Sequence, residues 1–286
     1  MSSDSILRSR AHPLIKRVGA IQAGREPAML VLEGDRLIDD ALDAKCALEV
    51  VLVAENRADR IRELERGKQP VRVVDAELMQ RISALQTSPG ILALCAAPRS
   101  IALAELPLER DALVLVAAGV ADPGNLGALA RCAEAFGASA LVIARGGASP
   151  WNEKALRGSM GSLLRIPVCH GETPDAIACA LEQRGVRQVT AATRGGDDPR
   201  AFDWRGPCAL WISGETGALP EAARSFARLT IPMAGRAESL NVTVAAALLL
   251  FTSGRTGNAA EHRAVVTRDE RRSATHAERR KRSRRG

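Results

Sequence analysis

The sequence has few of the features that mark metal-binding, membrane or secreted proteins. Its six cysteines are scattered, and none forms a CxxC pair or a Cys/His cluster, so we expect no metal site. There is no signal peptide and no apolar run long enough to span a bilayer, which predicts a cytoplasmic protein. Aromatic residues make up only 2% of the chain, and tyrosine is absent. We attribute this scarcity in part to coding bias and draw no function from it.

The charge is placed unevenly along the chain. The 286 residues carry a net charge of +7, and residues 255–286 alone hold eleven Lys/Arg and four Asp/Glu. The part before this tail therefore holds equal numbers of basic and acidic side chains. A basic tail on a neutral body suggests a polyanionic partner such as nucleic acid. A solvated, disordered end without a partner is the alternative that composition leaves open.

Strands alternate with helices up to Ala97 and again from Ala112, which predicts two α/β domains. Hydrophobic residues make up 46% of the chain, enough for a sizeable core. The apolar run Ala112–Ala117 suits a central strand of a parallel sheet. We place a small α/β domain at residues 1–97, a linker at 98–110, a second domain at 111–254 and a disordered tail at 255–286.

The first candidate site segment is Asp122–Arg131, DPGNLGALAR. We predict a loop over Val120–Gly127 and then a helix over Leu129–Phe136. Asn125 and the amides of the first helical turn would face the carboxyl edge of the sheet, where a phosphate could bind. Arg131 follows roughly 1.7 turns later in an apolar segment, so its guanidinium must reach an edge or a partner. The alternative is a glycine-rich turn with an arginine that extends along the surface.

The second segment is Ala209–Pro220, in which an apolar strand runs directly into Gly214 and Glu215. A carboxylate at the end of a buried strand is costly unless it pairs with a cation or binds a ligand. Glu215 is therefore a candidate for positioning a ligand or Arg131. A glutamate that caps a following helix is the alternative.

The third segment is Ile231–Phe251, which we predict to start as a strand, to break at Gly235 and to continue as an apolar helix. A polar turn with Ser239 and Asn241 lies between the strand and the helix. In α/β proteins small ligands bind at the turn between a strand and the helix that follows it. Helix capping explains Asn241 equally well.

Together these segments resemble the SpoU-type (TrmH-like) branch of the SPOUT RNA methyltransferases. Asp122–Arg131 is similar to the family's Pro-Gly-Asn-x-Gly turn with a following Arg. Ser213–Leu219 is similar to its Gly-x-Glu-x-x-Gly-Leu stretch, although Ser213 and Ala218 stand where glycine is common. Ile231–Val242 matches Ile-Pro-Met-x-Gly-x-x-x-Ser-Leu-Asn-Val. Weaker or shorter similarities are found at Lys154–Pro167, His12–Lys16 and Leu32–Leu37.

The resemblance implies S-adenosylmethionine-dependent methylation of a ribose 2′-hydroxyl in RNA, with ribosomal RNA favoured over transfer RNA. It implies a small N-terminal α/β substrate-binding domain and a C-terminal parallel-sheet SPOUT domain. The latter would contain a deep trefoil knot, an exception to the usual unknotted connections. It also implies a homodimer in which the partner chain completes each site.

The resemblance also assigns roles to individual residues. The catalytic residues would be Arg131, Asn125, Glu215, Ser239 and Asn241. The cofactor-binding residues would be Gly214, Ile231, Met233, Leu240 and Ser239. Arg131 would stand closest to the removal of the proton from the 2′-hydroxyl. Because arginine is nearly always protonated, a base role, an electrostatic role and the participation of an RNA phosphate all stay open.

Two further functions are weighed against this one. The first is an RNA-binding module of the same fold without catalytic activity, in which the N-terminal domain and the tail are the functional parts. The second is a nucleotide-dependent enzyme of the ordinary doubly wound type. The chain lacks the GxGxxG and GxxxxGK[ST] patterns, which weakens the second.

Overall fold

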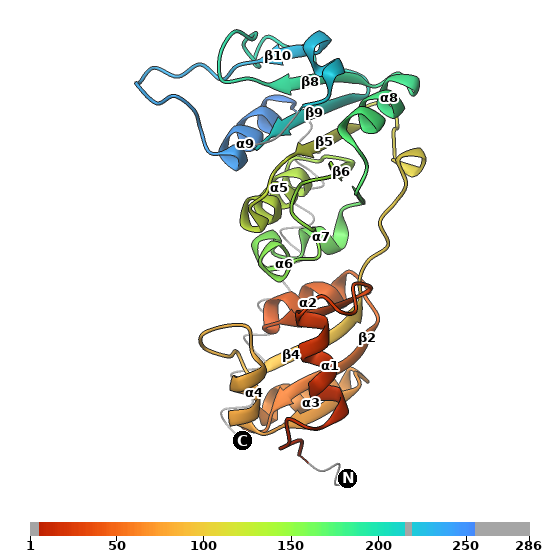
Figure 1. Cartoon of the computed structure of the whole chain (residues 1–286), viewed down its shortest axis with the longest axis vertical. Helices are drawn as coiled ribbons and strands as arrows, with labels where there is room; N and C mark the ends of the chain where they lie inside the picture. The colour runs from red at the N-terminus through yellow and green to blue at the C-terminus, as the bar shows by residue number, and fades with distance from the viewer. Residues whose placement is uncertain (1–5, 215–218, 255–286) are drawn as a thin grey trace.

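The computed structural model of the protein describes residues 6–214 and 219–254 of the chain. Two sheets follow each other along the longest axis of the molecule, with the N-terminal sheet at one end (Figure 1). The predicted basic tail and Glu215 lie outside the described residues. No helix in the described part of the chain is both long and apolar enough to cross a bilayer.

The first sheet has four strands in the order β1-β4-β2-β3, in which only β2 and β3 pair in parallel. Its strands are β1 (Met29–Glu33), β2 (Leu48–Ala54), β3 (Val71–Val74) and β4 (Ile91–Ala96), and its helices are α1 (Pro13–Gln22), α2 (Asp35–Asp43), α3 (Ala58–Arg66) and α4 (Ala76–Ile82). Alternate strand residues point to opposite faces. One face packs against α1 and α4, and the other against α2 and α3.

The second sheet has six parallel strands in the order β10-β8-β9-β5-β6-β7. The strands are β5 (Leu113–Ala118), β6 (Ala140–Ile143), β7 (Val168–His170), β8 (Arg187–Ala191), β9 (Cys208–Ser213) and β10 (Ala227–Leu229). The helices are α5 (Pro123–Ala135), α6 (Glu153–Ser159), α7 (Ser162–Arg165), α8 (Pro174–Gln183) and α9 (Val242–Thr252), with short 3₁₀ turns η1 (Leu103–Glu105) and η2 (Glu221–Ser225). The predicted α/β class with a parallel second sheet is confirmed.

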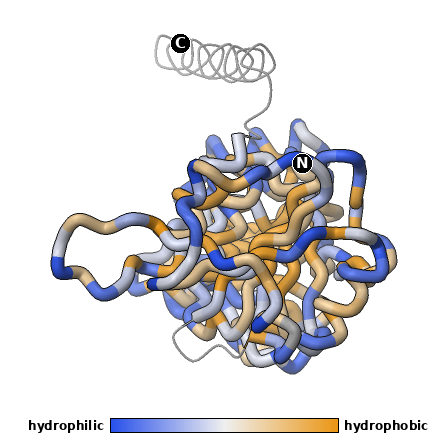
Figure 2. Tube along the Cα trace, turned by 90° about the horizontal axis from the view of Figure 1, so that it is seen from above, coloured by the Kyte–Doolittle hydropathy of each residue, from blue (hydrophilic) through white to orange (hydrophobic). Residues whose placement is uncertain are grey.

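Both faces of this second sheet are covered, as its apolar central strand β5 requires. Helices α5 and α9 pack on one face, and α8 with the segment around η1 packs on the other. Apolar residues are concentrated in the interior, as Figure 2 shows. The central strand β5 is buried along its whole length.

The chain builds this sheet outward from β5 in two directions. It first adds β6 and β7 on one side, then returns to place β8, β9 and β10 on the other. Strands β5 and β9 lie side by side and both end at the same edge, with Ala118 opposite Ser213. Such a reversal of strand order leaves a crevice at the carboxyl ends of the strands, where ligands bind in open α/β sheets.

Two of the local predictions are wrong. Helix α5 begins at Pro123 rather than at Leu129, because Asp122 caps it and proline suits the first helical position. The strand predicted at Ile231 ends earlier, since β10 stops at Leu229. Pro232, which has no N–H to donate, follows shortly after that end.

The predicted linker lies along the second sheet rather than standing free of it. The amide of Ile101 donates to the carbonyl oxygen of Val168 at 2.9 Å, so the segment continues the edge at β7. Leu106 is buried, and Arg184, the C-cap residue of α8, donates to the carbonyl oxygens of Leu103 and Leu106. These contacts attach the segment to the second sheet before the chain enters β5.

Candidate active site

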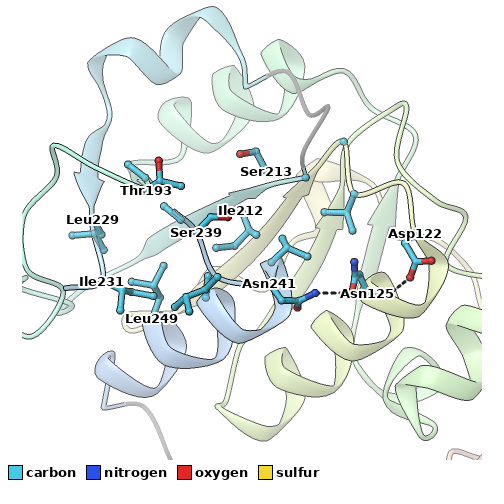
Figure 3. A pocket seen from close by; sticks show the side chains of 18 of the residues that line it. Asp122, Asn125, Thr193, Ile212, Ser213, Leu229, Ile231, Ser239, Asn241 and Leu249 are labelled. Atoms are coloured by element: carbon cyan, nitrogen blue, oxygen red, sulfur yellow. Dashed lines mark hydrogen bonds between the residues drawn. The ribbon is translucent and has the colours of Figure 1, made fainter. Parts of the chain in front are cut away.

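A cavity of about 580 Å³ lies at the carboxyl edge of the second sheet, where β5 and β9 end. This volume is in the range of small-molecule sites. Its lining comes from the turn before α5, the ends of β8 and β9, and the segment between β10 and α9 (Figure 3). All three segments singled out in the sequence therefore contribute to one cavity.

The N-terminus of α5 forms one wall. Oδ1 of Asp122 accepts the main-chain N–H of Asn125 at 2.8 Å, which caps the helix. Nζ of Lys154 donates to Oδ2 of Asp122 at 2.6 Å. The hydrogen bond from Lys154, and then that from Asn125, hold the pKa of Asp122 below its usual value. The start of α5 therefore stays capped at neutral pH.

Asn241 and Asn125 point toward one another from α9 and α5 (Figure 3). The side-chain amide of Asn241 donates to Oδ1 of Asn125 at 3.4 Å. Oδ1 of Asn241 accepts the main-chain N–H of Thr243 at 2.9 Å, so Asn241 is the N-cap of α9. Capping and a place at the cavity are thus not alternatives for this residue.

The segment from Ile231 to Asn241 forms the opposite wall. Ile231, Met233, Ser239 and Leu240 line the cavity, and Ser239 is largely exposed. Among the described residues, the main-chain amides of residues 231–240 donate to no other main-chain group. These unpaired groups are available to bind a ligand at the rim.

Gly214 follows β9 and lines the cavity beside the end of β5. A Cβ added to Gly214 would lie 2.4 Å from the carbonyl oxygen of Gly119 and 3.1 Å from Cα of Val120. The main chains that follow β5 and β9 therefore lie so close together here that position 214 has no space for a side chain. The next residue, Glu215, is outside the described residues.

Helix α5 presents Asn125 to the cavity, whereas Gly127 and Arg131, four residues apart, lie on another side of the helix. Gly127 packs against α6, where an added Cβ would lie 2.3 Å from the carbonyl oxygen of Ala155. Arg131 is exposed and does not line the cavity, and no ion pair with another described residue holds its guanidinium. Within a single chain Arg131 is thus a surface arginine. For Arg131 to act in catalysis, its guanidinium must contact a group that does not belong to the cavity of its own chain.

Sequence reasoning missed one part of the lining. Ala191, Ala192 and Thr193 reach the cavity at the end of β8. This strand is amphipathic and short, and the turn after it matches none of the sequence patterns considered. In residues 6–214 and 219–254, no group of three or more His, Cys, Asp or Glu side chains is placed to hold a metal ion.

Two known families match separate parts of the chain. Residues 112–251 match the SpoU rRNA Methylase family, and residues 23–93 match the MRM3-like substrate binding domain. The chain is 33% identical over 225 residues to 23S rRNA (guanosine(2553)-2′-O)-methyltransferase RlmP of Bacillus subtilis, covering 77% of this chain and 86% of that protein. It is 32% identical over 224 residues to the 23S rRNA (guanosine-2′-O-)-methyltransferase RlmB of Xanthomonas axonopodis, covering 74% and 90%.

Solved structures give the same relationship. An AdoMet-bound rRNA methyltransferase from Sinorhizobium meliloti is similar with a TM-score of 0.75 and 27% identity, covering 88% of this chain and 97% of that one. The SpoU methyltransferase AviRb from Streptomyces viridochromogenes, in complex with AdoMet, is similar with a TM-score of 0.74 and 27% identity, covering 84% and 97%. With its three ordered segments around one cavity, the chain belongs to the SpoU rRNA methylase family.

Proposed function

We propose that the protein transfers the methyl group of S-adenosylmethionine to a ribose 2′-hydroxyl of ribosomal RNA. The observation that carries this proposal is that all three family segments contribute to one cavity at the strand-order reversal of the second sheet. The curated relatives reported above are named as 23S rRNA 2′-O-methyltransferases, which supports ribosomal over transfer RNA. The match of residues 23–93 supports an RNA-binding role for the first domain.

The cavity fits S-adenosylmethionine in size and lining. Apolar side chains of Ile212, Ile231 and Leu249 offer a slot for the adenine, and unpaired main-chain groups lie at the rim. Gly214, Ile231, Met233, Leu240 and Ser239 would hold the cofactor. When bound, it supplies a methyl group on a sulfonium, which has a good leaving group. We also propose that the 231–241 segment belongs to the trefoil knot typical of the family.

The residues of the protein must then orient the ribose and help to remove the proton from its 2′-oxygen. A neutral hydroxyl is a weak nucleophile and needs such activation. Asn125 and Ser239 would hold the ribose and its phosphate, and Asn241 would keep Asn125 in place through their side-chain contact. Arg131 would supply positive charge at the reacting oxygen, and Glu215 would position Arg131 or its own loop.

We further propose that the protein is a homodimer, which α9 supports. This helix is apolar around its whole circumference, and such helices are buried on all sides. One side packs on α5 and the sheet, whereas Val244, Leu248 and Phe251 are exposed along one stripe at 47%, 42% and 63%. In the homodimer that the family resemblance implies, the partner chain completes each site, and we propose that the partner's Arg131 is the residue that does so. We also propose a cytoplasmic location, because the 23S rRNA methyltransferases reported above are bacterial.

A transfer assay tests the proposed function. Purified protein is incubated with methyl-labelled S-adenosylmethionine and with ribosomal RNA from a strain that lacks the gene, and the modified nucleotide is then mapped by mass spectrometry. We expect label at a single ribose of the large-subunit RNA. Cofactor binding without transfer to ribosomal or transfer RNA would contradict the proposal. Absence of cofactor binding as well would favour the RNA-binding module without activity.

Gly214→Ala tests the cofactor site. The added methyl group would overlap the main chain of Gly119 and Val120, so the main chain at the end of β9, which lines the cavity, must shift. We expect S-adenosylmethionine affinity to fall at least about ten-fold by calorimetry. The matched control is Gly19→Ala on α1, where an added Cβ has no heavy atom within 4 Å. An unchanged S-adenosylmethionine affinity in the Gly214→Ala variant would show that Gly214 is not part of the cofactor site.

A further inference from the structure

Arg165, at the end of α7, joins the two parts of the molecule. Its Nε and Nη2 donate to the two carboxylate oxygens of Glu134 on α5, at 2.6 and 2.9 Å. Its Nη1 lies 3.4 Å from Oδ1 of Asp40 on α2, and Nη2 also donates to the carbonyl oxygen of Met160 at 3.1 Å. Every nitrogen of this guanidinium therefore has a partner. Figure 1 shows α7 between α5 and the first domain.

The surroundings hold Arg165 in this place. Gly161, which precedes α7, has φ +82°, and a Cβ there would lie 2.4 Å from Nη1 of Arg165 and 2.6 Å from Cβ of Asp40. Asp40 is itself buried. The bidentate contact with Glu134 is the shorter one and fixes both the distance and the plane of the guanidinium.

This arrangement has a consequence for Arg131. Glu134 follows it by three residues on α5, and side chains three apart are neighbours on a helix surface. If the carboxylate of Glu134 were not bound to Arg165, it would therefore be within reach of Arg131. Burial raises the pKa of Glu134, but the hydrogen bonds from Arg165 and Ser162 and the charge of Arg165 together outweigh it and leave the pKa below its usual value. Glu134 is thus ionised at neutral pH, yet its two oxygens are taken by Arg165.

We propose that Arg165 is a positioning residue for Arg131. By occupying both oxygens of Glu134, it prevents that carboxylate from binding the guanidinium of Arg131, which stays free for the reacting ribose. The role rests on the proposed function, because it concerns the availability of the arginine assigned to catalysis. It is distinct from that of a strut between the domains, which would act through Asp40 rather than through Glu134.

Arg165→Gln, alone and together with Glu134→Gln, separates these roles. We expect the single variant to lower kcat for methyl transfer about five-fold, the effect of a ~1 kcal/mol ion pair between Glu134 and Arg131. S-adenosylmethionine affinity should stay unchanged. The double variant should regain most of the lost kcat, because the freed carboxylate is gone. Glu134→Gln alone should retain wild-type kcat.

Asp40→Asn is the matched control, since it removes the charge partner in the first domain and leaves the contact between Arg165 and Glu134. The proposal expects a smaller loss of kcat here than in Arg165→Gln. A double variant as slow as Arg165→Gln, or a wild-type rate in Arg165→Gln, would overturn it. If Arg165→Gln does not fold, Arg165→Lys, which keeps the charge but loses the bidentate fork, should give a smaller loss of kcat that Glu134→Gln likewise restores. A wild-type protein without transfer activity would instead refute the proposed function itself.

Discussion

Arg131→Ala is expected to lower kcat for methyl transfer by at least about a hundred-fold, as losses of catalytic charge or proton transfer commonly do. The reason is chemical rather than structural, because the side chain is exposed and no ion pair with another described residue holds it. Its removal should therefore leave the melting temperature and S-adenosylmethionine affinity unchanged. Single-turnover transfer, calorimetry and thermal unfolding measure the three quantities.

Arg224→Ala on η2 is the matched control, since it removes another exposed arginine of the second domain that does not line the cavity. Arg131→Lys keeps the charge but loses the planar fork, so we expect partial activity. An Arg131→Ala protein with near wild-type kcat would remove the main catalytic assignment.

A mixing experiment identifies the chain in which Arg131 acts. Arg131→Ala protein has an intact cavity, and Gly214→Ala protein has an intact Arg131. If Arg131 serves the partner's cavity, mixed dimers contain one complete site, and random exchange restores about a quarter of wild-type activity. If Arg131 serves its own cavity, each chain of the mixed dimer is defective and no activity returns.

Leu248→Asp is expected to produce a monomer without methyl transfer activity. Leu248 lies at the centre of the exposed stripe on α9, four residues after Val244 and three before Phe251. A carboxylate at the centre of an apolar interface loses its hydration without gaining a partner, which costs several kcal/mol. The chain itself should still fold, because this side chain is exposed within it. Sedimentation velocity and the transfer assay measure the outcome.

Ala58→Asp on α3 is the control for an added negative charge at an exposed helix residue of the first domain. This variant should have the same sedimentation coefficient and the same activity as the wild type. A dimeric, active Leu248→Asp protein would show that this stripe is not the interface.

Local pattern predicted much of the second sheet. The apolar run at Ala112–Ala117 became the buried central strand β5, since a strand covered on both faces needs no polar alternation. Where the pattern failed, at Val120–Gly127, a capping aspartate followed by proline started α5 six residues earlier than the apolar periodicity indicated. Local chemistry at the helix start was the stronger signal.

The residues of the candidate site were found from the sequence to different extents. Asn125, Gly214, Ser239 and Asn241 belong to spaced motifs, and the fold brings all of them to one cavity. Thr193 belongs to no motif and reaches the cavity only because β8 pairs beside β9. Motif spacing reports residues that share one loop or helix, whereas strand order decides which loops meet.

By itself, the sequence determined the family, the α/β class and the segments that carry the site, because each depends on residue types at short separations. The tertiary structure decided the rest. It left Arg131 outside the lining of its own cavity, and it placed Arg165 against both Glu134 and Asp40, the latter 125 positions earlier in the chain. Such contacts depend on how helices α2, α5 and α7 pack in three dimensions, and no local pattern encodes that packing.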